Sequence, residues 1–152
     1  MIRARIWLVV VLIGVLAAYF LLFAGHGELV TVLRVIDGDT LEVEYRGVVE
    51  RLRLIGIDAP ERNECFYDEA TEALSSMVQH GQVRLEVGTE SRDKYGRLLG
   101  YVFTGGTFIN EEMVTAGYAT EWQYGLNDKY VRRLVTAESL ARRQARGLWG
   151  RC

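Results

Sequence analysis

The sequence predicts an α+β fold, a closed five-stranded β-barrel with three helices, preceded by one separate apolar helix at the N-terminus. Beyond residue 30, short segments of alternating apolar and polar residues recur between glycine-containing turns, a pattern typical of half-buried strands. Longer segments with helical spacing of apolar residues follow the third and the fifth of these strands. The 152 residues suffice for one domain with a substantial core.

The N-terminal segment, residues 1–24, is predicted to be a membrane anchor or a signal peptide. Arg3 and Arg5 precede an uncharged run of nineteen residues, 6–24, which as a helix would be about 28 Å long, close to the hydrocarbon thickness of a bilayer. This length favours a transmembrane anchor over a cleavable signal peptide, whose apolar core is shorter, and over a buried core helix. The upstream arginines place residues 25–152 outside the cytoplasm under both leading alternatives. We expect a single-pass cell-membrane protein, or a secreted or periplasmic one after signal cleavage.

Residues 25–29 are expected to form a linker, and residues 30–152 the folded domain. Strands are predicted over residues 30–36, 40–46, 49–57, 83–87 and 98–103, and helices over residues 67–80, 110–116 and 127–146. Asn110 and Asn127 are predicted N-caps of the last two helices. Arginines alternate with leucines in the third strand, so Arg53 points outward if the leucines fill a barrel. This order of elements is typical of a Greek-key barrel of the oligonucleotide-binding (OB) type, which binds ligands on its outer face.

The charge of the expected domain is not that of a protein that coats nucleic acid. The 18 basic residues less Arg3 and Arg5 leave 16 against 20 acidic residues, a net charge near −4. Residues 132–151 hold six arginines against the single acid Glu138. This cluster is interpreted as a solvated helix face in preference to a dedicated track for phosphates.

The two cysteines, Cys65 and Cys152, are predicted to form a disulfide. They are an even pair in a domain that is expected to lie in an oxidising compartment. Their pairing requires Cα atoms within about 7 Å of each other, which the sequence does not fix.

Acidic residues and arginines concentrate between residues 35 and 61. Asp37 and Asp39 follow one apolar run, Asp58 and Glu61 follow another, and the strand between them carries arginines. Hard cations prefer carboxylate and carbonyl oxygens, and arginine forks suit the oxygens of a phosphate. The combination predicts a metal-assisted enzyme acting on phosphodiesters. Alone, the first pair would more simply be turn residues bonding their own backbone.

Four motifs, taken in order, resemble those of the staphylococcal nuclease (thermonuclease) family. They are Val-Ile-Asp-Gly-Asp-Thr (35–40), Arg-Leu-Ile-Gly-Ile-Asp-Ala-Pro-Glu (53–61), Asp-Lys-Tyr-Gly-Arg (93–97) and Asn-Glu-Glu-Met-Val-Thr-Ala-Gly-Tyr-Ala (110–119). The resemblance covers residues 30–149. It implies an OB-type barrel with three helices and an endonuclease that needs Ca²⁺, hydrolyses DNA and RNA, and leaves 3′-phosphates. No protein partner is expected.

The resemblance also implies roles for individual residues. Asp39 and Asp58 match the calcium-binding carboxylates, Ala59 the carbonyl ligand, Asp37 an acid acting through water, Arg53 and Arg97 the phosphate-binding arginines, Glu61 the catalytic carboxylate, and Lys94 and Tyr95 substrate-binding residues. Arg51 is interpreted as an ordinary strand arginine. Trp122 and Tyr124 are candidates for stacking on bases, with core packing as the alternative.

Two other classes of function remain open at this point. One is a non-catalytic module on the same fold that binds nucleic acid or protein, and the other is a tethered interaction domain with structural calcium. A binding module has no chemical need for the complete set of acids and arginines, so an enzyme is the favoured interpretation.

Overall fold

The computed structural model describes residues 14, 27–79 and 81–152. The predicted anchor or signal peptide, apart from Gly14, and residues 25 and 26 of the expected linker lie outside the described residues. Among the residues that are described, no helix is both long and apolar enough to cross a membrane. The first strand begins at Glu28, so the last two residues of the expected linker belong to the folded domain.

The five predicted strands and three predicted helices are all present. The strands are β1 (Glu28–Asp37), β2 (Thr40–Tyr45), β3 (Val48–Leu54), β4 (Gly56–Asp58), β5 (Gln82–Arg92), β6 (Leu98–Thr104), β7 (Thr107–Phe108) and β8 (Thr120–Trp122). The helices are α2 (Tyr67–Val78), α3 (Ile109–Thr115), α4 (Val131–Arg143) and α5 (Leu148–Arg151). The third predicted strand is divided into β3 and β4, and the short elements β7, β8 and α5 are additional.

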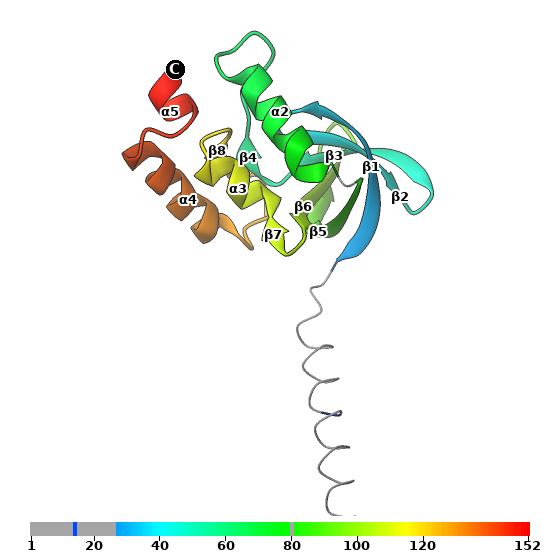
Figure 1. Ribbon diagram of the computed structural model, residues 1–152. Coiled ribbons are helices and arrows are strands. Elements are labelled where there is room, and N and C mark those ends of the chain that lie inside the picture. Colours follow the sequence, from blue (N-terminus) through cyan, green and yellow to red (C-terminus); the bar gives the residue numbers. More distant parts are fainter. Residues whose placement is uncertain (1–13, 15–26, 80) are drawn as a thin grey trace, which may run out of the picture.

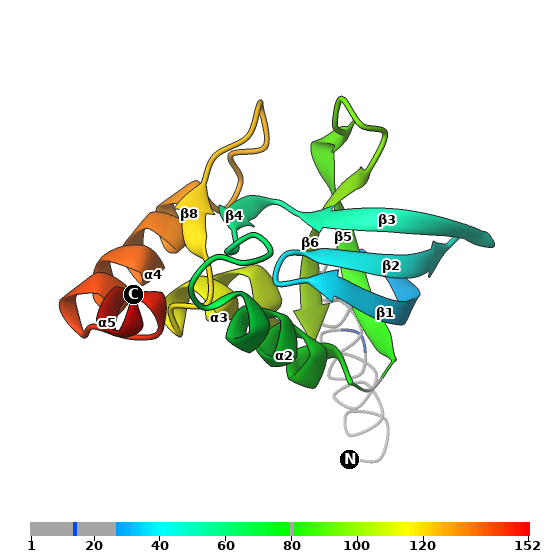
Figure 2. The same ribbon diagram turned by 90° about the horizontal axis from the view of Figure 1, so that it is seen from above.

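Five strands close into a barrel of the predicted OB type. Their order is β3-β2-β1-β5-β6, and parallel pairing between β3 and β6 closes the ring. The helices α2, α3 and α4 lie to one side of the barrel, and α3 packs between the barrel and α4 (Figures 1 and 2). One face of β3 packs into the core, and the alternate residues of the strand point outward from its other face.

The predicted alternation in β3 is confirmed. Leu52 and Leu54 are fully buried in the core, where each contributes about 1.5 to 3 kcal/mol through the removal of apolar surface from water. Arg53, between them, extends from the other face of the strand. Packing of the leucines therefore fixes the direction of the arginine.

The chain leaves the barrel at Gly56. This residue has a φ of +80°, and a Cβ there would lie 2.4 Å from Cδ1 of Leu134 in α4, so only glycine fits both the backbone and the space. The following strand, β4, pairs with β8 and not with the barrel, with Asp58 opposite Thr120. The break thus carries Asp58 into a separate two-stranded sheet beside the barrel.

The predicted N-caps, Asn110 and Asn127, are wrong. Asn110 lies inside α3, fully buried, where it accepts a hydrogen bond from Val102 N–H and donates one to the Ile55 carbonyl. Asn127 is buried ahead of α4, and its amide accepts from the N–H and donates to the carbonyl of Glu90. Both asparagines bond to backbone groups of distant segments that would otherwise be buried without partners. The free energy of these hydrogen bonds outweighs that of capping a helix. The helix predicted over residues 127–146 accordingly spans only Val131–Arg143.

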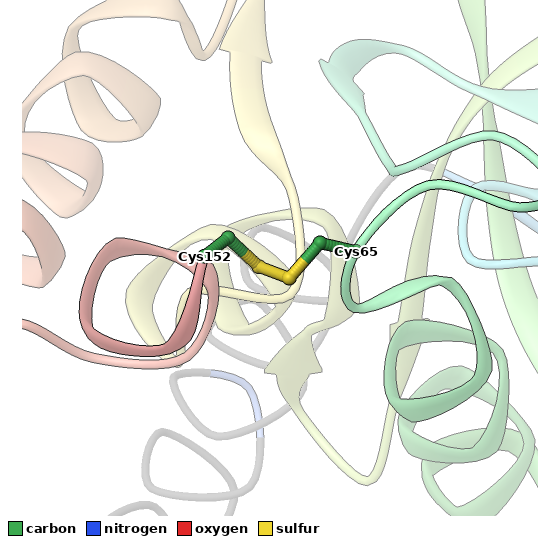
Figure 3. The surroundings of a disulfide bond; sticks show 2 residues. All are labelled: Cys65 and Cys152. Atoms are coloured by element: carbon green, nitrogen blue, oxygen red, sulfur yellow. A yellow bond between two sulfur atoms is a disulfide. The ribbon is translucent and has the colours of Figure 1, made fainter.

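The predicted pairing of Cys65 with Cys152 is present in the structure. Their Cα atoms are 5.9 Å apart, and the bond joins the loop after β4 to α5 (Figure 3). The two cysteines are 87 residues apart in the sequence, so the disulfide links the loop of the second motif to the last helix.

Candidate active site

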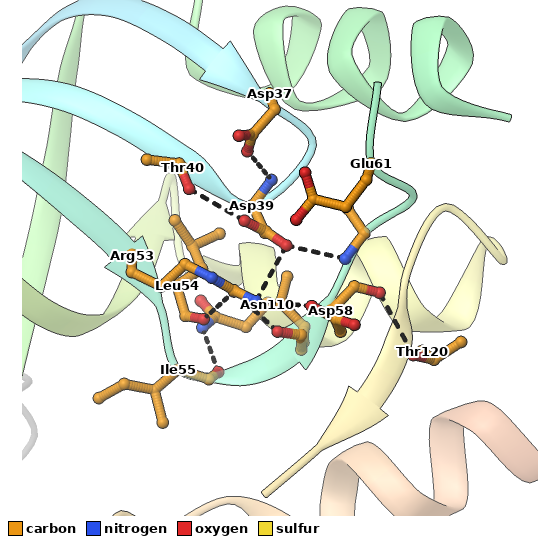
Figure 4. A network of polar contacts seen from close by, with 12 residues as sticks. Asp37, Asp39, Thr40, Arg53, Leu54, Ile55, Asp58, Glu61, Asn110 and Thr120 are labelled. Atoms are coloured by element: carbon orange, nitrogen blue, oxygen red, sulfur yellow. Dashed lines mark hydrogen bonds and ion pairs between the residues drawn. The ribbon is translucent and has the colours of Figure 1, made fainter. Parts of the chain in front are cut away.

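Arg53 lies at the centre of a polar network between β2, β3 and β4 (Figure 4). Its Nη2 is 2.9 Å from Oδ1 of Asp58 and 3.1 Å from Oδ2 of Asp39, while Nη1 donates to the carbonyls of Leu54 and Ile57. Only 14% of the Arg53 side chain is exposed. One guanidinium therefore joins the two carboxylates that the sequence assigns to a metal, and its orientation is set by β3 and β4.

Asp39 is the buried carboxylate of this network. Its Oδ1 accepts a hydrogen bond from the Thr40 hydroxyl, and its Oδ2 accepts one from the Ala59 N–H at 2.8 Å. Burial raises the pKa of Asp39 to about 7, although the charge of Arg53 and the Ala59 hydrogen bond act in the opposite direction. The raised pKa therefore reflects the removal of this carboxylate from water, which its hydrogen bonds and the arginine do not fully offset.

Asp37 and Asp58 differ from Asp39 in their surroundings. Asp37 accepts a hydrogen bond from the backbone N–H of Asp39 and so holds the turn between β1 and β2. Half of the Asp58 side chain is exposed, and the Thr120 hydroxyl donates to its carbonyl across the β4–β8 pair. Asp58 is therefore the accessible carboxylate next to Arg53.

Glu61 follows on the loop between β4 and α2. Its backbone N–H donates to Oε2 of Glu64 at 2.7 Å, and the Glu64 N–H donates back to the Glu61 carbonyl at 2.9 Å. The Glu61 side chain is exposed, and Figure 4 shows its carboxylate turned toward the Asp39 side of the network. Glu64, which the sequence did not single out, thus shapes the turn that presents Glu61.

Arg53 also borders a pocket of about 230 Å³ that brings in the third motif. The pocket is lined by Arg53, Leu54, Ile55, Gly56, Ile57, Asp93, Lys94, Tyr95, Arg97, Leu99, Trp122 and Tyr124. The predicted residues Arg53, Arg97, Lys94 and Tyr95 therefore surround one cavity. Asp58 and Ala59 line a separate groove, and Asp37, Asp39 and Glu61 are not part of the pocket wall.

Asp93 orients Arg97, a role that sequence reasoning missed. Its carboxylate accepts hydrogen bonds from Nε of Arg97 at 2.6 Å and from the backbone N–H groups of Tyr95 and Arg97. Burial opposes ionisation of Asp93, but these hydrogen bonds outweigh it and hold its pKa below the usual range. The spacing of four residues between an acid and an arginine was the available signal.

Aromatic side chains form the rim of the pocket. Tyr95 is 73% exposed, with Lys94 Nζ 5.0 Å from its ring centroid, and Trp122 is 57% exposed. Tyr124 is partly exposed on the same wall. Trp122 and Tyr124 are therefore not packed in the core, and stacking on bases stays a prediction for both.

The arginines of residues 132–151 are partly engaged within the domain. Arg133 forms an ion pair with Glu111, Arg142 lies 3.8 Å over the Trp149 ring and pairs with Glu138, and Arg146 donates to the Thr115 carbonyl. The side chains of Arg133 and Arg142 in α4 are still half exposed, which agrees with the predicted solvated helix face, whereas Arg146 lies beyond the end of this helix.

The donor set fits a hard cation by its chemistry. Asp39 and Asp58 offer carboxylate oxygens and Ala59 a backbone carbonyl, which are the ligand types that calcium prefers. No cluster of three or more acidic, histidine or cysteine side chains suited to a metal occurs in the described ranges, so backbone oxygens or water would complete the shell. Asp39 and Asp58 share the single cation Arg53, and a bound cation would add the positive charge that favours the ionised form of both carboxylates.

Comparisons with known proteins agree with this geometry. Residues 51–151 match the family described as "Staphylococcal nuclease homologue". The chain is 35% identical over 124 residues to the thermonuclease of Staphylococcus hyicus, an overlap of 78% of this chain and 73% of the relative. It is 36% identical over 132 residues to the thermonuclease of Staphylococcus intermedius, covering 83% and 79% of the two chains. The SPbeta prophage-derived endonuclease YokF of Bacillus subtilis is 34% identical over 130 residues, 80% of this chain and 44% of YokF. The chain belongs to the staphylococcal nuclease family.

Proposed function

We propose that this protein is a calcium-dependent endonuclease that hydrolyses phosphodiester bonds of DNA and RNA and leaves 3′-phosphates. The observation that carries the proposal is the position of Arg53, which contacts Asp39 and Asp58 and borders the pocket that Arg97 also lines. Relatives named thermonuclease and endonuclease support the same activity.

Asp39, Asp58 and the Ala59 carbonyl would hold the calcium ion, with Asp37 acting through water. The ion would supply electrostatic stabilisation of a phosphate oxygen and would activate a water molecule. Its affinity would depend on Asp39 being ionised, which the charge of the ion itself favours.

The residues of the chain perform the remaining steps. Arg97 binds non-bridging phosphate oxygens through its Nη groups, since Asp93 takes only its Nε, while Nη2 of Arg53 would exchange its contacts with Asp39 and Asp58 for a phosphate oxygen. Both arginines stabilise the charge that grows in the transition state. Glu61 accepts a proton from the attacking water as its oxygen bonds to phosphorus. The bond from phosphorus to the 5′-oxygen breaks, that oxygen takes up a proton from solvent water, and the phosphate stays on the 3′ side.

The rim of the pocket would bind the nucleotide next to the scissile bond. Lys94 adds positive charge, and Tyr95 and Trp122 offer exposed rings on which bases stack. The negative domain gives little long-range attraction for nucleic acid, so binding depends on these local contacts and on the metal.

The proposed location is outside the cytoplasm, with a membrane anchor formed by residues 1–24. The support is the uncharged run preceded by two arginines. A secreted or periplasmic form after signal cleavage is the alternative.

Cleavage of single-stranded DNA by the full chain tests the proposed activity. We expect cleavage with calcium, none with a chelator, and products whose 3′ ends need a phosphatase before a polymerase extends them. Glu61→Gln keeps the volume of the side chain and removes the base, so turnover should fall by roughly two to four orders of magnitude with calcium binding retained. Glu69→Gln, an exposed change in α2, is the matched control. Binding of DNA or calcium without any cleavage would instead identify a non-catalytic module.

A further inference from the structure

We propose that the Cys65–Cys152 disulfide positions the loop that carries Glu61, so that reduction by a dithiol slows the chemical step while the fold and substrate binding persist. The proposal rests on the proposed role of Glu61 as general base. It assigns to the disulfide a positioning role in the reaction in addition to any contribution to stability.

The loop needs an attachment because its own contacts are few. Ahead of Glu61, the Ala59 N–H is bonded to Asp39, and after it the chain turns back through the reciprocal hydrogen bonds between Glu61 and Glu64. Asn63 and Phe66 then have φ values of +72° and +75°, a region that asparagine tolerates but that a bulky residue such as Phe66 adopts rarely. Such a turn persists when the surrounding structure holds it, and Cys65 is its next covalent connection to the rest of the domain.

The other cysteine, Cys152, follows α5, whose backbone is held against the end of α3. The Leu148 N–H at the start of α5 donates to the Gly117 carbonyl at 2.9 Å, directly after α3. The backbones are so close there that a Cβ on Gly117 would lie 2.3 Å from the Arg146 carbonyl oxygen. Because α3 is held in the core by the buried Met113, Cys152 is fixed relative to the core. The disulfide therefore fixes the loop relative to the core as well.

One noncovalent contact reinforces this attachment beyond the disulfide. The Phe66 ring stacks on Tyr118, with centroids 5.7 Å apart and planes at 24°. Phe66 is the N-cap of α2, so the stack fixes the end of the loop that leads into the helix. It lies on the far side of Cys65 from Glu61. Between these two residues, all within the described part of the chain, the one backbone hydrogen bond to α2 is the long one of 3.4 Å from the Tyr67 N–H to the Glu64 carbonyl, so the disulfide is the stronger attachment of this segment.

The disulfide is also accessible and lies close to the reacting groups. Both cysteines are exposed and line a groove of about 400 Å³ whose wall includes Asp58 and Ala59. A dithiol reduces the bond in two exchanges: one thiolate attacks a protein sulfur to form a mixed disulfide, and the second thiolate displaces the protein from it. The protein gains two electrons and two protons as two thiols, and the dithiol is oxidised to a cyclic disulfide.

Single-turnover and steady-state cleavage by the full chain, with calcium saturating and with or without dithiothreitol, tests the proposal. We expect kcat to fall by on the order of tenfold on reduction, because small displacements of a catalytic group cost this much or more. KM should change less than about twofold, since the substrate-binding residues are elsewhere. Reoxidation should restore kcat, and Cys65→Ser combined with Cys152→Ser should reproduce the reduced state and not respond to dithiothreitol. Circular dichroism at the assay temperature verifies that each form is folded.

A second comparison separates positioning from a general loss of structure. In a Glu61→Gln background the base is already absent, so reduction should change turnover less than about twofold. In an Arg97→Lys background, where the base is intact, the full loss on reduction should remain. If thiol titration shows that reduction is complete and kcat is unchanged, the proposal is overturned. Equal losses of turnover in the two backgrounds would overturn it as well. Wild-type turnover of Glu61→Gln would instead overturn the proposed function.

Discussion

Arg53 has two partners of opposite accessibility, and its contacts constrain what any substitution near it does. On one side it compensates Asp39, which is buried, and on the other it pairs with the half-exposed Asp58. Removing the arginine would leave a buried carboxylate without its cation, which is usually costlier than the intact pair is favourable. Changes at Arg53 therefore mix stability with catalysis, and the two are better separated at Asp39 and Arg97.

Asp39→Asn is expected to stabilise the metal-free protein at neutral pH. Burial raises the pKa of Asp39 from 3.8 to about 7, so between about pH 4 and pH 7 the folded state binds a proton that the unfolded chain releases. The unfolding free energy of the wild-type protein consequently falls as pH rises through this window, and the asparagine variant escapes that loss. We expect a gain on the order of 3 kcal/mol at pH 8 and little difference at pH 4, measured by urea unfolding with a chelator.

The same substitution should weaken calcium binding, because it removes a charged ligand. Glu44→Gln, an exposed change in β2, is the control and should alter neither quantity. Equal stability of the Asp39→Asn and wild-type proteins at pH 8 would show that the buried carboxylate is not destabilising.

Arg97→Lys is expected to slow the chemical step about a hundredfold and to leave calcium affinity unchanged. Lysine keeps the positive charge but loses the fork that binds two phosphate oxygens, and it also loses the Nε hydrogen bond to Asp93. Single-turnover cleavage and calcium titration by calorimetry measure the two effects. The exposed strand arginine supplies the control, since Arg51→Lys should cleave at nearly the wild-type rate. Similar rates for all three proteins would remove Arg97 from the catalytic set.

At the scale of the elements, buried asparagines replace what sequence reasoning took for helix caps. Asn127→Ala is expected to lower the unfolding free energy by about 2 to 4 kcal/mol, because it leaves both backbone groups of Glu90 without their partner. The loop that precedes α4 carries Tyr124 and directly follows Trp122, the last residue of β8, so a weaker nucleotide affinity should accompany the loss. Urea unfolding and binding of single-stranded DNA measure these changes.

A nearby exposed residue gives the comparison for that experiment. Gln123→Ala lies in the same loop on the protein surface and should change stability by less than about 0.5 kcal/mol. If Asn127→Ala lowered the unfolding free energy equally little, water would be forming the hydrogen bonds to the Glu90 backbone in place of the asparagine side chain.

These elements also show how far the sequence predicts the fold. The alternation of leucine with arginine in β3 and the apolar spacing in α2 are local signals, and both elements are where they predict. The break at Gly56 and the partners of Asn110 depend on contacts with α4, β6 and the end of β3, which local patterns do not contain.

The candidate site, like the fold, was predicted from the sequence only in part. Asp39, Asp58 and Arg53 were predicted as a group from charge and motif, and the structure brings them into direct contact. The contribution of Trp122 was left undecided because it depends on β8, a three-residue strand that forms only by pairing with β4. Short elements stabilised by tertiary pairing leave little periodicity in a sequence.

For the whole molecule, the disulfide and the proposed anchor are consistent with the same compartment. A disulfide between two exposed cysteines persists in an oxidising environment, and the arginines ahead of the apolar run predict a domain outside the cytoplasm. The domain would then meet nucleic acid outside the cytoplasm, where cleavage does not endanger the chromosome of the cell.

The anchor itself is the last prediction. Full-length protein expressed in bacteria is expected to sediment with membranes and to resist carbonate extraction, because nineteen uncharged residues bury enough apolar surface to hold a spanning helix. External protease should degrade the domain in intact spheroplasts, as the positive-inside rule requires. A matched variant with Arg3 and Arg5 changed to glutamate keeps the apolar run and removes the orientation signal, so less of its domain should be accessible to the protease. Recovery of a soluble form that begins near Gly25 would show instead that the segment is a cleaved signal peptide, with the domain released on the same side of the membrane.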